Sequence, residues 1–170
     1  MSLHFNPEIE LPLMEAFYTI QGEGFHQGKA AYFIRLGGCD VGCVWCDIKE
    51  SWPTDGFPQK SAAELCLEVQ ASGAKYVVIT GGEPSMYNLD DLCAAFHTMN
   101  LQVWIETSGS HPFSGTWDWI CVSPKKFKAP RPDWLSKANE FKVVVFHSSD
   151  LTWAQQFVPQ LPGNCMLFLQ

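Results

Sequence analysis

Two short runs of consecutive apolar residues restrict the folds open to this chain more than any other feature. The runs Tyr76–Ile79 and Val143–Phe146 are apolar on both faces, as buried parallel strands tend to be. Segments with a helical pattern lie between such runs, and this alternation implies strand–helix–strand crossovers. The sequence therefore predicts an α/β protein with a mostly parallel sheet, either open or curled into part of a barrel.

The other predicted elements follow from hydrophobic pattern and from residues that begin or end helices. Ser61 and Glu64 form a capping box that opens a helix to about Ser72, and Gly73 ends it. Two further helices are predicted over Asn88–Met99 and Leu151–Phe157. The basic, proline-rich segment 125–132 is predicted to be an exposed loop. The predicted strands are Leu13–Ile20, Ala31–Leu36, Tyr76–Thr80, Gln102–Glu106, Trp119–Val122, Glu140–Phe146 and Cys165–Leu169.

Size and charge exclude several classes of protein. The chain has 170 residues, which suits one domain over 1–170, and 46% of them are hydrophobic. The net charge of −7 argues against nucleic acid as a partner, because phosphate binding needs clustered Lys and Arg. No apolar stretch approaches the ~20 residues that cross a bilayer, and no signal peptide is evident. We therefore expect a cytoplasmic protein without a membrane partner, whose thiols stay reduced.

Three of the seven cysteines lie within eight positions, in the pattern C-x3-C-x2-C formed by Cys39, Cys43 and Cys46. The surrounding glycines and aspartates mark a polar loop, which disfavours a purely structural role. One interpretation is a zinc site completed by His26, although structural zinc ligands usually come as two separated pairs. The other is a [4Fe-4S] cluster with one iron left open for a non-protein ligand. The remaining cysteines fall inside predicted helices or strands: Cys66, Cys93, Cys121 and Cys165.

Two other motifs follow predicted strands at the edge where α/β sheets bind ligands. In "TGGEP", Gly81 and Gly82 let a ligand approach the backbone, with the carboxylate of Glu83 beside them. In "CVSPKK", Ser123 and Lys125 lie just past another strand. Each motif alone is equally consistent with an ordinary turn.

The cysteine pattern, with Trp45 just before the last cysteine, resembles the signature of the radical S-adenosylmethionine (SAM) enzymes. In that superfamily the open iron chelates the amino and carboxylate groups of SAM, and an electron from the cluster cleaves SAM to methionine and a 5′-deoxyadenosyl radical. The resemblance thus implies a partial (β/α) barrel of the radical SAM type. It also implies a reason for three ligands, since a fourth would block SAM.

A longer series of motifs resembles one family within that superfamily. The stretch "FYTIQGEGFHQGKAAYFIRLGGC" and then "CDIKESW", "VVITGGEP", "IETSG", "ICVSPK" and "NEFKVVV" are similar, in order, to 7-carboxy-7-deazaguanine synthases. The resemblance covers roughly residues 14 to 170. It implies a carbon–nitrogen lyase of queuosine biosynthesis, a tRNA modification pathway. The implied reaction converts 6-carboxy-5,6,7,8-tetrahydropterin to 7-carboxy-7-deazaguanine with loss of ammonia, and SAM is regenerated.

The same resemblance implies roles for individual residues, with no catalytic residue beyond the cluster and SAM. The cluster ligands would be the three loop cysteines. The residues around SAM would be Trp45, Asp47, Gly81, Gly82, Glu83, Ser123, Pro124, Lys125 and Gln170. The residues around the pterin would be Ile20, Gln21, Gly22, Glu23, Arg35, Thr80 and Glu106, with Arg35 pairing with the substrate carboxylate. The implied partners are an electron donor such as flavodoxin or ferredoxin and a second copy of the chain.

The sequence departs from the family pattern at two places. Ile48 stands where the family usually has a threonine whose hydroxyl helps to bind Mg2+, so we expect weak magnesium dependence or none. The family pattern also continues past Gln170, so we expect either that part of the site is missing or that a mobile tail follows. Two other functions remain open: a glycyl-radical activase acting on a protein partner, and a zinc-stabilised binding domain without enzymatic activity.

Overall fold

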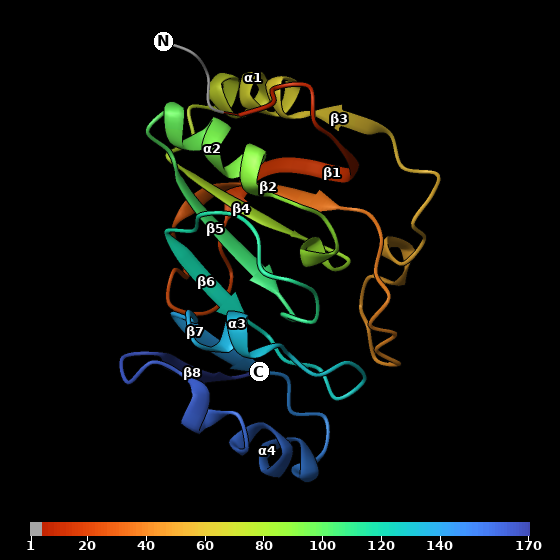
Figure 1. The fold of residues 1–170 in the computed structure, drawn as a ribbon, viewed down its shortest axis with the longest axis vertical. Helices are drawn as coiled ribbons and strands as arrows, with labels where there is room; N and C mark the ends of the chain where they lie inside the picture. The colour runs from red at the N-terminus through yellow and green to blue at the C-terminus, as the bar shows by residue number, and fades with distance from the viewer. Residues whose placement is uncertain (1–4) are drawn as a thin grey trace.

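A curved eight-stranded sheet with helices on its outer side forms the frame of the molecule (Figure 1). The structure is a computed structural model that describes residues 5–170. The strand order is β3-β1-β2-β4-β5-β6-β7-β8. The strands are β1 (Glu10–Ile20), β2 (Ala30–Leu36), β3 (Gln59–Ser61), β4 (Tyr76–Gly81), β5 (Gln102–Thr107), β6 (Trp119–Val122), β7 (Glu140–Val143) and β8 (Met166–Leu169).

Most neighbouring strands in this sheet are parallel. From β2 through β4, β5, β6 and β7 to β8 every pairing is parallel, whereas β1 runs antiparallel to both β2 and β3. The carboxyl ends of the parallel strands therefore meet at one edge of the sheet. In Figure 1 the orange loop that follows β2, which carries the clustered cysteines, lies at this edge. The prediction of an α/β fold with a mostly parallel sheet of the partial-barrel type is confirmed.

In the described part of the chain, four helices and three short 3-10 turns connect the strands, and side-chain hydrogen bonds cap the amino ends of α1 and α4. They are α1 (Ala62–Ser72), α2 (Asp90–Thr98), α3 (Pro132–Leu135) and α4 (Ser148–Gln155), with 3-10 turns η1 (Lys49–Ser51), η2 (Pro84–Met86) and η3 (Val158–Gln160). The predicted capping box is present: Glu64 N–H donates to Ser61 Oγ over 3.2 Å, and Ser61 N–H donates to Glu64 Oε2 over 2.8 Å. Gly73 ends α1 at φ +71°. Within residues 5–170, no helix is both long and apolar enough to span a membrane.

Several predicted boundaries were wrong. The strand predicted over Glu140–Phe146 ends at Val143, because its partner β8 ends at Leu169, which lies opposite Val143, and Phe146 is exposed. The helix predicted over Leu151–Phe157 begins at Ser148, because His147 and Asp150 form a capping box that the sequence analysis did not consider. Cys165 precedes β8 rather than lying in it.

Two short elements had no counterpart in the sequence analysis. Strand β3 has three residues, and α3 has four, so neither is long enough to show a hydrophobic period. Pro132 occupies the first turn of α3, where its fixed φ suits a helix. Trp134 and Leu135 of α3 are fully buried in the main core.

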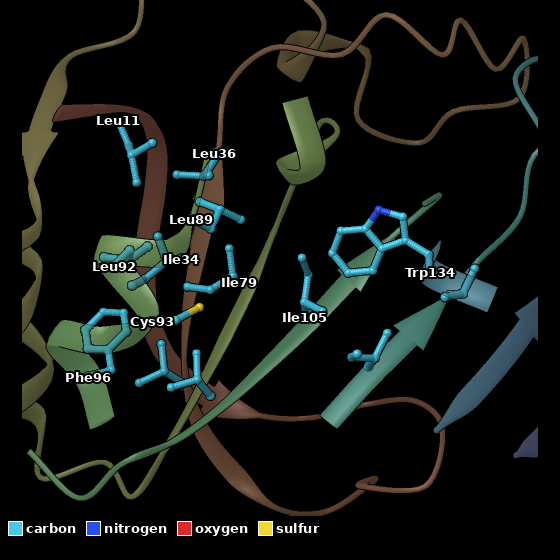
Figure 2. Close-up of a cluster of buried hydrophobic side chains, with 14 of the residues drawn as sticks. Leu11, Ile34, Leu36, Ile79, Leu89, Leu92, Cys93, Phe96, Ile105 and Trp134 are labelled. Atoms are coloured by element: carbon cyan, nitrogen blue, oxygen red, sulfur yellow. The ribbon is translucent and has the colours of Figure 1, made fainter. Parts of the chain in front are cut away.

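The outer face of the sheet and the helices enclose the main hydrophobic core. Alternate residues of the parallel strands point to this side, and Ile34, Ile79 and Ile105 from three neighbouring strands have no exposed surface. Figure 2 shows these side chains facing those of α2, among them Leu92 and Phe96. Full burial of one such side chain contributes about 1.5–3 kcal/mol. This layer holds the strands in register and leaves the opposite, inner face free for other uses.

The inner face is aromatic near the amino ends of the parallel strands. His26, from the loop between β1 and β2, stacks on Trp104 with ring centres 3.8 Å apart. Trp119 meets the same imidazole edge-on, and Tyr76 stacks on Trp104 with ring centres 4.7 Å apart. The loop of residues 21–29 thereby covers this end of the inner face. The polar residues of the same face lie farther along the strands, toward their carboxyl ends.

Candidate active site

A cavity of about 560 Å3 occupies the inner face near the carboxyl ends of the strands. The loop after β2 lines one side of it, and polar residues of β2, β5 and β7 line the rest. All but one of the site residues expected from sequence line this cavity. They are Ile20, Gln21, Gly22, Glu23, Arg35, Cys39, Cys43, Trp45, Cys46, Asp47, Thr80, Gly81, Gly82, Glu83, Glu106, Ser123, Lys125 and Gln170. The exception, Pro124, lines an adjoining groove of about 190 Å3 to which Trp45 and Lys125 also contribute.

Cys39, Cys43 and Cys46 all face the cavity as free thiols. Among the described residues that line it, they are the only cysteines and there is no histidine. Burial raises the pKa of Cys43 to about 11 despite the nearby ammonium of Lys125, and burial also raises the pKa of Cys39. Iron or zinc would have to displace these protons, as metal binding to thiols always does.

The arrangement suits a cluster better than a single ion. Within residues 5–170, no three His, Cys, Asp or Glu side chains converge as ligands of one metal ion. His26, the proposed fourth zinc ligand, stacks on Trp104 in the aromatic layer and does not line the cavity. The interpretation as a zinc site completed by His26 was therefore wrong. Three thiols from one loop that line the same cavity, with no histidine beside them among the described lining residues, fit a group with several metal atoms and an open position.

Gly81, the last residue of β4, and Gly82 allow the backbone to lie directly against the cysteine loop. Gly82 N–H donates to Leu36 O over 2.9 Å, and Glu83 N–H donates to Gly38 O over 2.9 Å. A Cβ on Gly82 would lie 2.8 Å from Cβ of Cys39, and a Cβ on Gly81 would lie 2.6 Å from Leu36 N. Any larger residue would push the two loops apart. The cavity edge at this point is therefore bare backbone, which a ligand can approach closely.

Glu83 ties this edge to the end of β5. One carboxylate oxygen accepts hydrogen bonds from Ser85 N–H at 3.0 Å, from its hydroxyl at 2.6 Å and from the hydroxyl of Thr107. The other accepts from Ser108 N–H at 2.8 Å and from the Ser108 hydroxyl. The side chain is 2% exposed. Five donors compensate for the burial of this charge, so Glu83 fixes the relative positions of the β4 and β5 loops.

Lys125 connects the loop after β6 to the cysteine loop. Its ammonium donates to Ser123 Oγ over 2.6 Å and lies 5.3 Å from the centre of the Trp45 ring. Burial lowers the pKa of Lys125 from its usual range. Ser123, Lys125 and Trp45 thus form one side of the cavity mouth next to the thiols.

The wall of the cavity formed by the strands and by the loop after β1 carries charges of both signs. On β2, Arg35 Nε donates to Glu15 Oε1 over 2.6 Å. Four strands away on β7, Lys142 Nζ donates to Glu106 Oε2 over 3.1 Å and to Glu23 Oε2 over 2.8 Å. Gln21 Nε2 donates to the other oxygen of Glu106 over 2.7 Å. The cavity therefore has a cationic end at Arg35 and an end dominated by carboxylates.

Among the residues that line the cavity but were not predicted from the sequence are Lys142, Thr107 and Ser108. A usable signal existed for Lys142. In "EFKV" the charged residues Glu140 and Lys142 alternate with apolar ones, so both must point to the face opposite the core. Thr107 and Ser108 had no such signal, because their importance depends on the position of Glu83 in the neighbouring loop.

Comparisons with known proteins agree with this geometry. The sequence profile of the Radical SAM superfamily matches residues 33–124. A 7-carboxy-7-deazaguanine synthase of Flavobacterium psychrophilum is 49% identical over 160 residues, covering 94% of this chain and 76% of that protein. One of Synechocystis sp. is 42% identical over 162 residues, covering 95% and 78%. The crystal structure of QueE from Escherichia coli superposes with a TM-score of 0.83 at 32% identity, over 94% of this chain and 81% of that one.

Proposed function

This chain belongs to the 7-carboxy-7-deazaguanine synthase family of radical SAM enzymes, and we propose that it makes 7-carboxy-7-deazaguanine from 6-carboxy-5,6,7,8-tetrahydropterin with release of ammonia. Members of this family use a [4Fe-4S] cluster and SAM in the queuosine pathway. The observation that carries the proposal is the charge pattern of the cavity. Arg35 lies at one end and Glu106 with Glu23 at the other. The pterin has a carboxylate at one end and an edge of N–H groups at the other, so its two ends match.

We assign the three loop cysteines as the cluster ligands. Their thiols line the cavity wall next to the bare backbone of Gly81 and Gly82. When bound, the cluster and SAM supply the radical that starts the reaction by removing hydrogen from the substrate. The chain itself has to hold SAM against this wall. Backbone groups of the glycines offer hydrogen bonds without side-chain bulk, and the ammonium of Lys125 suits a carboxylate or ribose oxygen.

The remaining residues of the expected SAM set support the same wall. Trp45 and Ser123 position Lys125, and Glu83 holds the glycine loop against β5. Asp47 faces the cavity beside the last cysteine. Pro124 belongs to the adjoining groove, so its contact would be with a part of SAM that extends there. Gln170 donates to Glu23 Oε1, which puts it nearer the pterin end than the SAM assignment requires.

On the pterin side, we propose that Arg35 binds the substrate carboxylate and that Glu106 accepts N–H groups of the ring. Guanidinium binds a carboxylate through two parallel hydrogen bonds, and an ionised carboxylate is a pure acceptor. Thr80, Ile20 and Gly22 line the space between these two ends. Binding the two ends of one rigid ring system at fixed points sets which ring carbon faces the cysteine wall.

We further propose a single catalytic domain over residues 1–170, a homodimer, and a small electron carrier such as flavodoxin or ferredoxin as the reductant. The seven cysteines are free thiols, which accords with a cytoplasmic protein in a reducing compartment.

Cluster reconstitution tests the proposal most directly. After anaerobic treatment with iron and sulfide, we expect [4Fe-4S] stoichiometry and its visible absorbance. Alanine at Cys39, Cys43 or Cys46 should abolish that absorbance. Cys66→Ala and Cys93→Ala are matched controls, because both thiols lie in outer helices, and they should retain it. Loss of the cluster in either control would contradict the assignment.

A turnover assay then separates this function from its rivals. Reconstituted protein supplied with SAM, a reductant and 6-carboxy-5,6,7,8-tetrahydropterin should release ammonia and the deazaguanine product. A glycyl-radical activase would hold the cluster and cleave SAM but leave the pterin unchanged. A zinc-stabilised binding domain would take up zinc and form no cluster.

A further inference from the structure

A nearly buried Lys142 pairs with two more exposed carboxylates of the cavity, those of Glu106 (24% side-chain exposure) and Glu23 (46%). The Lys142 side chain is 6% exposed, and its ammonium lies 2.8 Å from Glu23 Oε2 and 3.1 Å from Glu106 Oε2. The second oxygen of each carboxylate is also engaged, Glu106 Oε1 by Gln21 and Glu23 Oε1 by Gln170. Each carboxylate oxygen has two lone pairs, so both side chains still have acceptor capacity that can face the cavity.

The other charged and titratable groups near this ammonium come from three neighbouring segments. Cys121 of β6 and Glu140 of β7 lie below it on the same face, and Lys125 follows β6. Burial raises the pKa of Cys121 well above its usual range, so that thiol stays neutral. Burial alone would lower the pKa of Lys142, but Glu106 and Glu23 raise it, and it remains an ammonium. The three paired groups thus carry a net charge of minus one.

We propose that Lys142 is a positioning residue of the pterin site, which balances the charges of Glu106 and Glu23 and orients both as acceptors for the N–H edge of the substrate. This inference rests on the function proposed above. Lys142 acts through the two carboxylates, while Arg35 binds the opposite end of the same ligand. Together they give the cavity a fixed polarity, so a pterin with its carboxylate reversed would place that carboxylate against Glu106 and Glu23, and its N–H donors against the donors of Arg35.

Loss of the ammonium should have a specific consequence. Without the ammonium between them, the two carboxylates repel each other, so the pKa of one should rise. A protonated carboxyl donates a hydrogen bond where the ring N–H needs an acceptor. The defect should therefore be greatest at low pH and should recede as the pH rises and both carboxylates ionise.

Binding of 6-carboxypterin, the aromatic analogue of the substrate, measures this effect without turnover. Calorimetry on the anaerobically reconstituted protein with SAM would compare Lys142→Met and Lys142→Arg with the unmodified protein. Lys75→Met is the matched control, because Lys75 is exposed before β4 at the opposite edge of the sheet. Dissociation constants are expressed as ratios to the unmodified protein at each pH, so that titration of the analogue itself cancels.

For Lys142→Met we expect a ratio of about ten or more near pH 6 that falls toward about pH 8. Lys142→Arg should give a flat ratio, since it keeps the charge, and Lys75→Met should give a ratio near one. The double variant Lys142→Met/Glu23→Gln restores the net charge of minus one, so its ratio should also be flat. SAM binding should be unchanged throughout.

Several outcomes would overturn the inference. A ratio for Lys142→Met that does not vary with pH, or a pH dependence that persists in the double variant, would show that Lys142 acts only by packing. If Lys142→Met does not fold, as judged by circular dichroism, the double variant decides. If the double variant folds and its ratio of dissociation constants does not change with pH, the inference is supported. If the double variant fails to fold, the inference is contradicted. Failure of the unmodified protein to bind the analogue or turn over the pterin would refute the proposed function instead.

Discussion

Arg35 is held along one edge of its guanidinium and presents the other edge to the cavity. The pairing with Glu15 uses Nε, at 2.6 Å across the antiparallel β1–β2 pair. The two terminal nitrogens have no hydrogen bond or ion pair within residues 5–170, so the edge that they form can meet a ligand. This arrangement differs from a fully buried ion pair, because the Arg35 side chain is 22% exposed and Glu15 is 45% exposed. An arginine already fixed in this way loses little side-chain entropy when it binds a carboxylate.

Arg35→Lys should weaken substrate binding by on the order of 1–3 kcal/mol, because a point ammonium cannot form two parallel hydrogen bonds. SAM binding should change much less. Glu15→Gln is the control, since it loosens Arg35 but keeps the fork, and its effect should be smaller. Calorimetric titration of both ligands distinguishes these cases. Equal losses for substrate and SAM would mean that Arg35 is only structural.

Ile48 leaves a magnesium ion without a protein oxygen at this position. Its side chain is a hydrocarbon that lines the cavity, and its backbone carbonyl accepts hydrogen bonds from Ser51 N–H at 3.0 Å and Ser51 Oγ at 2.8 Å. Mg2+ requires near-octahedral oxygen coordination at short distance. Neither part of Ile48 supplies such a ligand.

We therefore expect turnover in chelator-treated buffer to depend weakly on added Mg2+ or not at all. Ile48→Thr supplies a hydroxyl and should increase the dependence. Initial rates with and without Mg2+ for both proteins test this. Strong activation of the unmodified protein, unaltered in Ile48→Thr, would mean that water replaces the missing hydroxyl.

The loop of residues 21–29 is the element that places Gln21 and Glu23 in the cavity. Glu140 on β7 fastens it: its Oε2 accepts from Phe25 N–H at 3.2 Å and from Trp119 Nε1 at 3.3 Å. Gly24 has φ +67°, and a Cβ there would lie 2.7 Å from Cδ of Glu140. The close approach and the positive φ both require glycine.

Gly24→Ala should displace the loop and cost about 1–3 kcal/mol in the free energy of unfolding. It should also raise KM for the pterin more than it lowers kcat, because the loop binds and orients the substrate. Gly28→Ala is a useful comparison. Gly28 also has a positive φ of +88°, but nothing lies within 4 Å of its added Cβ. Equal effects of the two substitutions would show that strain alone, and not contact with Glu140, matters.

Among the secondary-structure elements, those with a clear hydrophobic period or motif spacing were predicted from the sequence. The buried runs at β4 and β7, the capping box of α1 and the cysteine loop all depend on residues near each other in the chain. The resemblance to the family predicted most of the residues that line the cavity. What escaped prediction depends on contacts between distant residues. The partner of Lys142, Glu23, lies 119 positions away in the sequence. The hydrogen bonds that Glu83 accepts from Thr107 and Ser108 come from 24 and 25 positions away.

His26 couples the stability of the whole molecule to pH. Its ring is 8% exposed, and neither nitrogen has a hydrogen-bond partner among the described residues. Burial, and secondarily the charge of Lys29, lowers the pKa of His26 from 6.5 to about 4. The unfolded chain therefore binds a proton on this residue at a higher pH than the folded chain does. The contribution of His26 to stability is therefore full above pH 6.5 and is lost as the pH drops toward about 4.

The loss attributable to His26 should reach roughly 2–3 kcal/mol in the free energy of unfolding. His26→Phe keeps an aromatic ring against Trp104 but cannot be protonated, so its acid destabilisation should be smaller by that amount. Denaturant titrations at a series of pH values from 7 to 4 measure both proteins. Parallel curves for the two would mean that other groups, and not His26, govern acid stability.

The aromatic layer and the loop that Glu140 fastens close the cavity only at the amino ends of the parallel strands. At the pterin end, Ile20 is 63% exposed and the side chain of Glu23 is 46% exposed. A ligand held between Arg35 and Glu106 could therefore reach solvent beside Ile20 and Glu23, without passing the thiols and the glycine backbone where SAM would lie. The two ligands would then need no fixed order of arrival, and the product could leave while SAM stays in place.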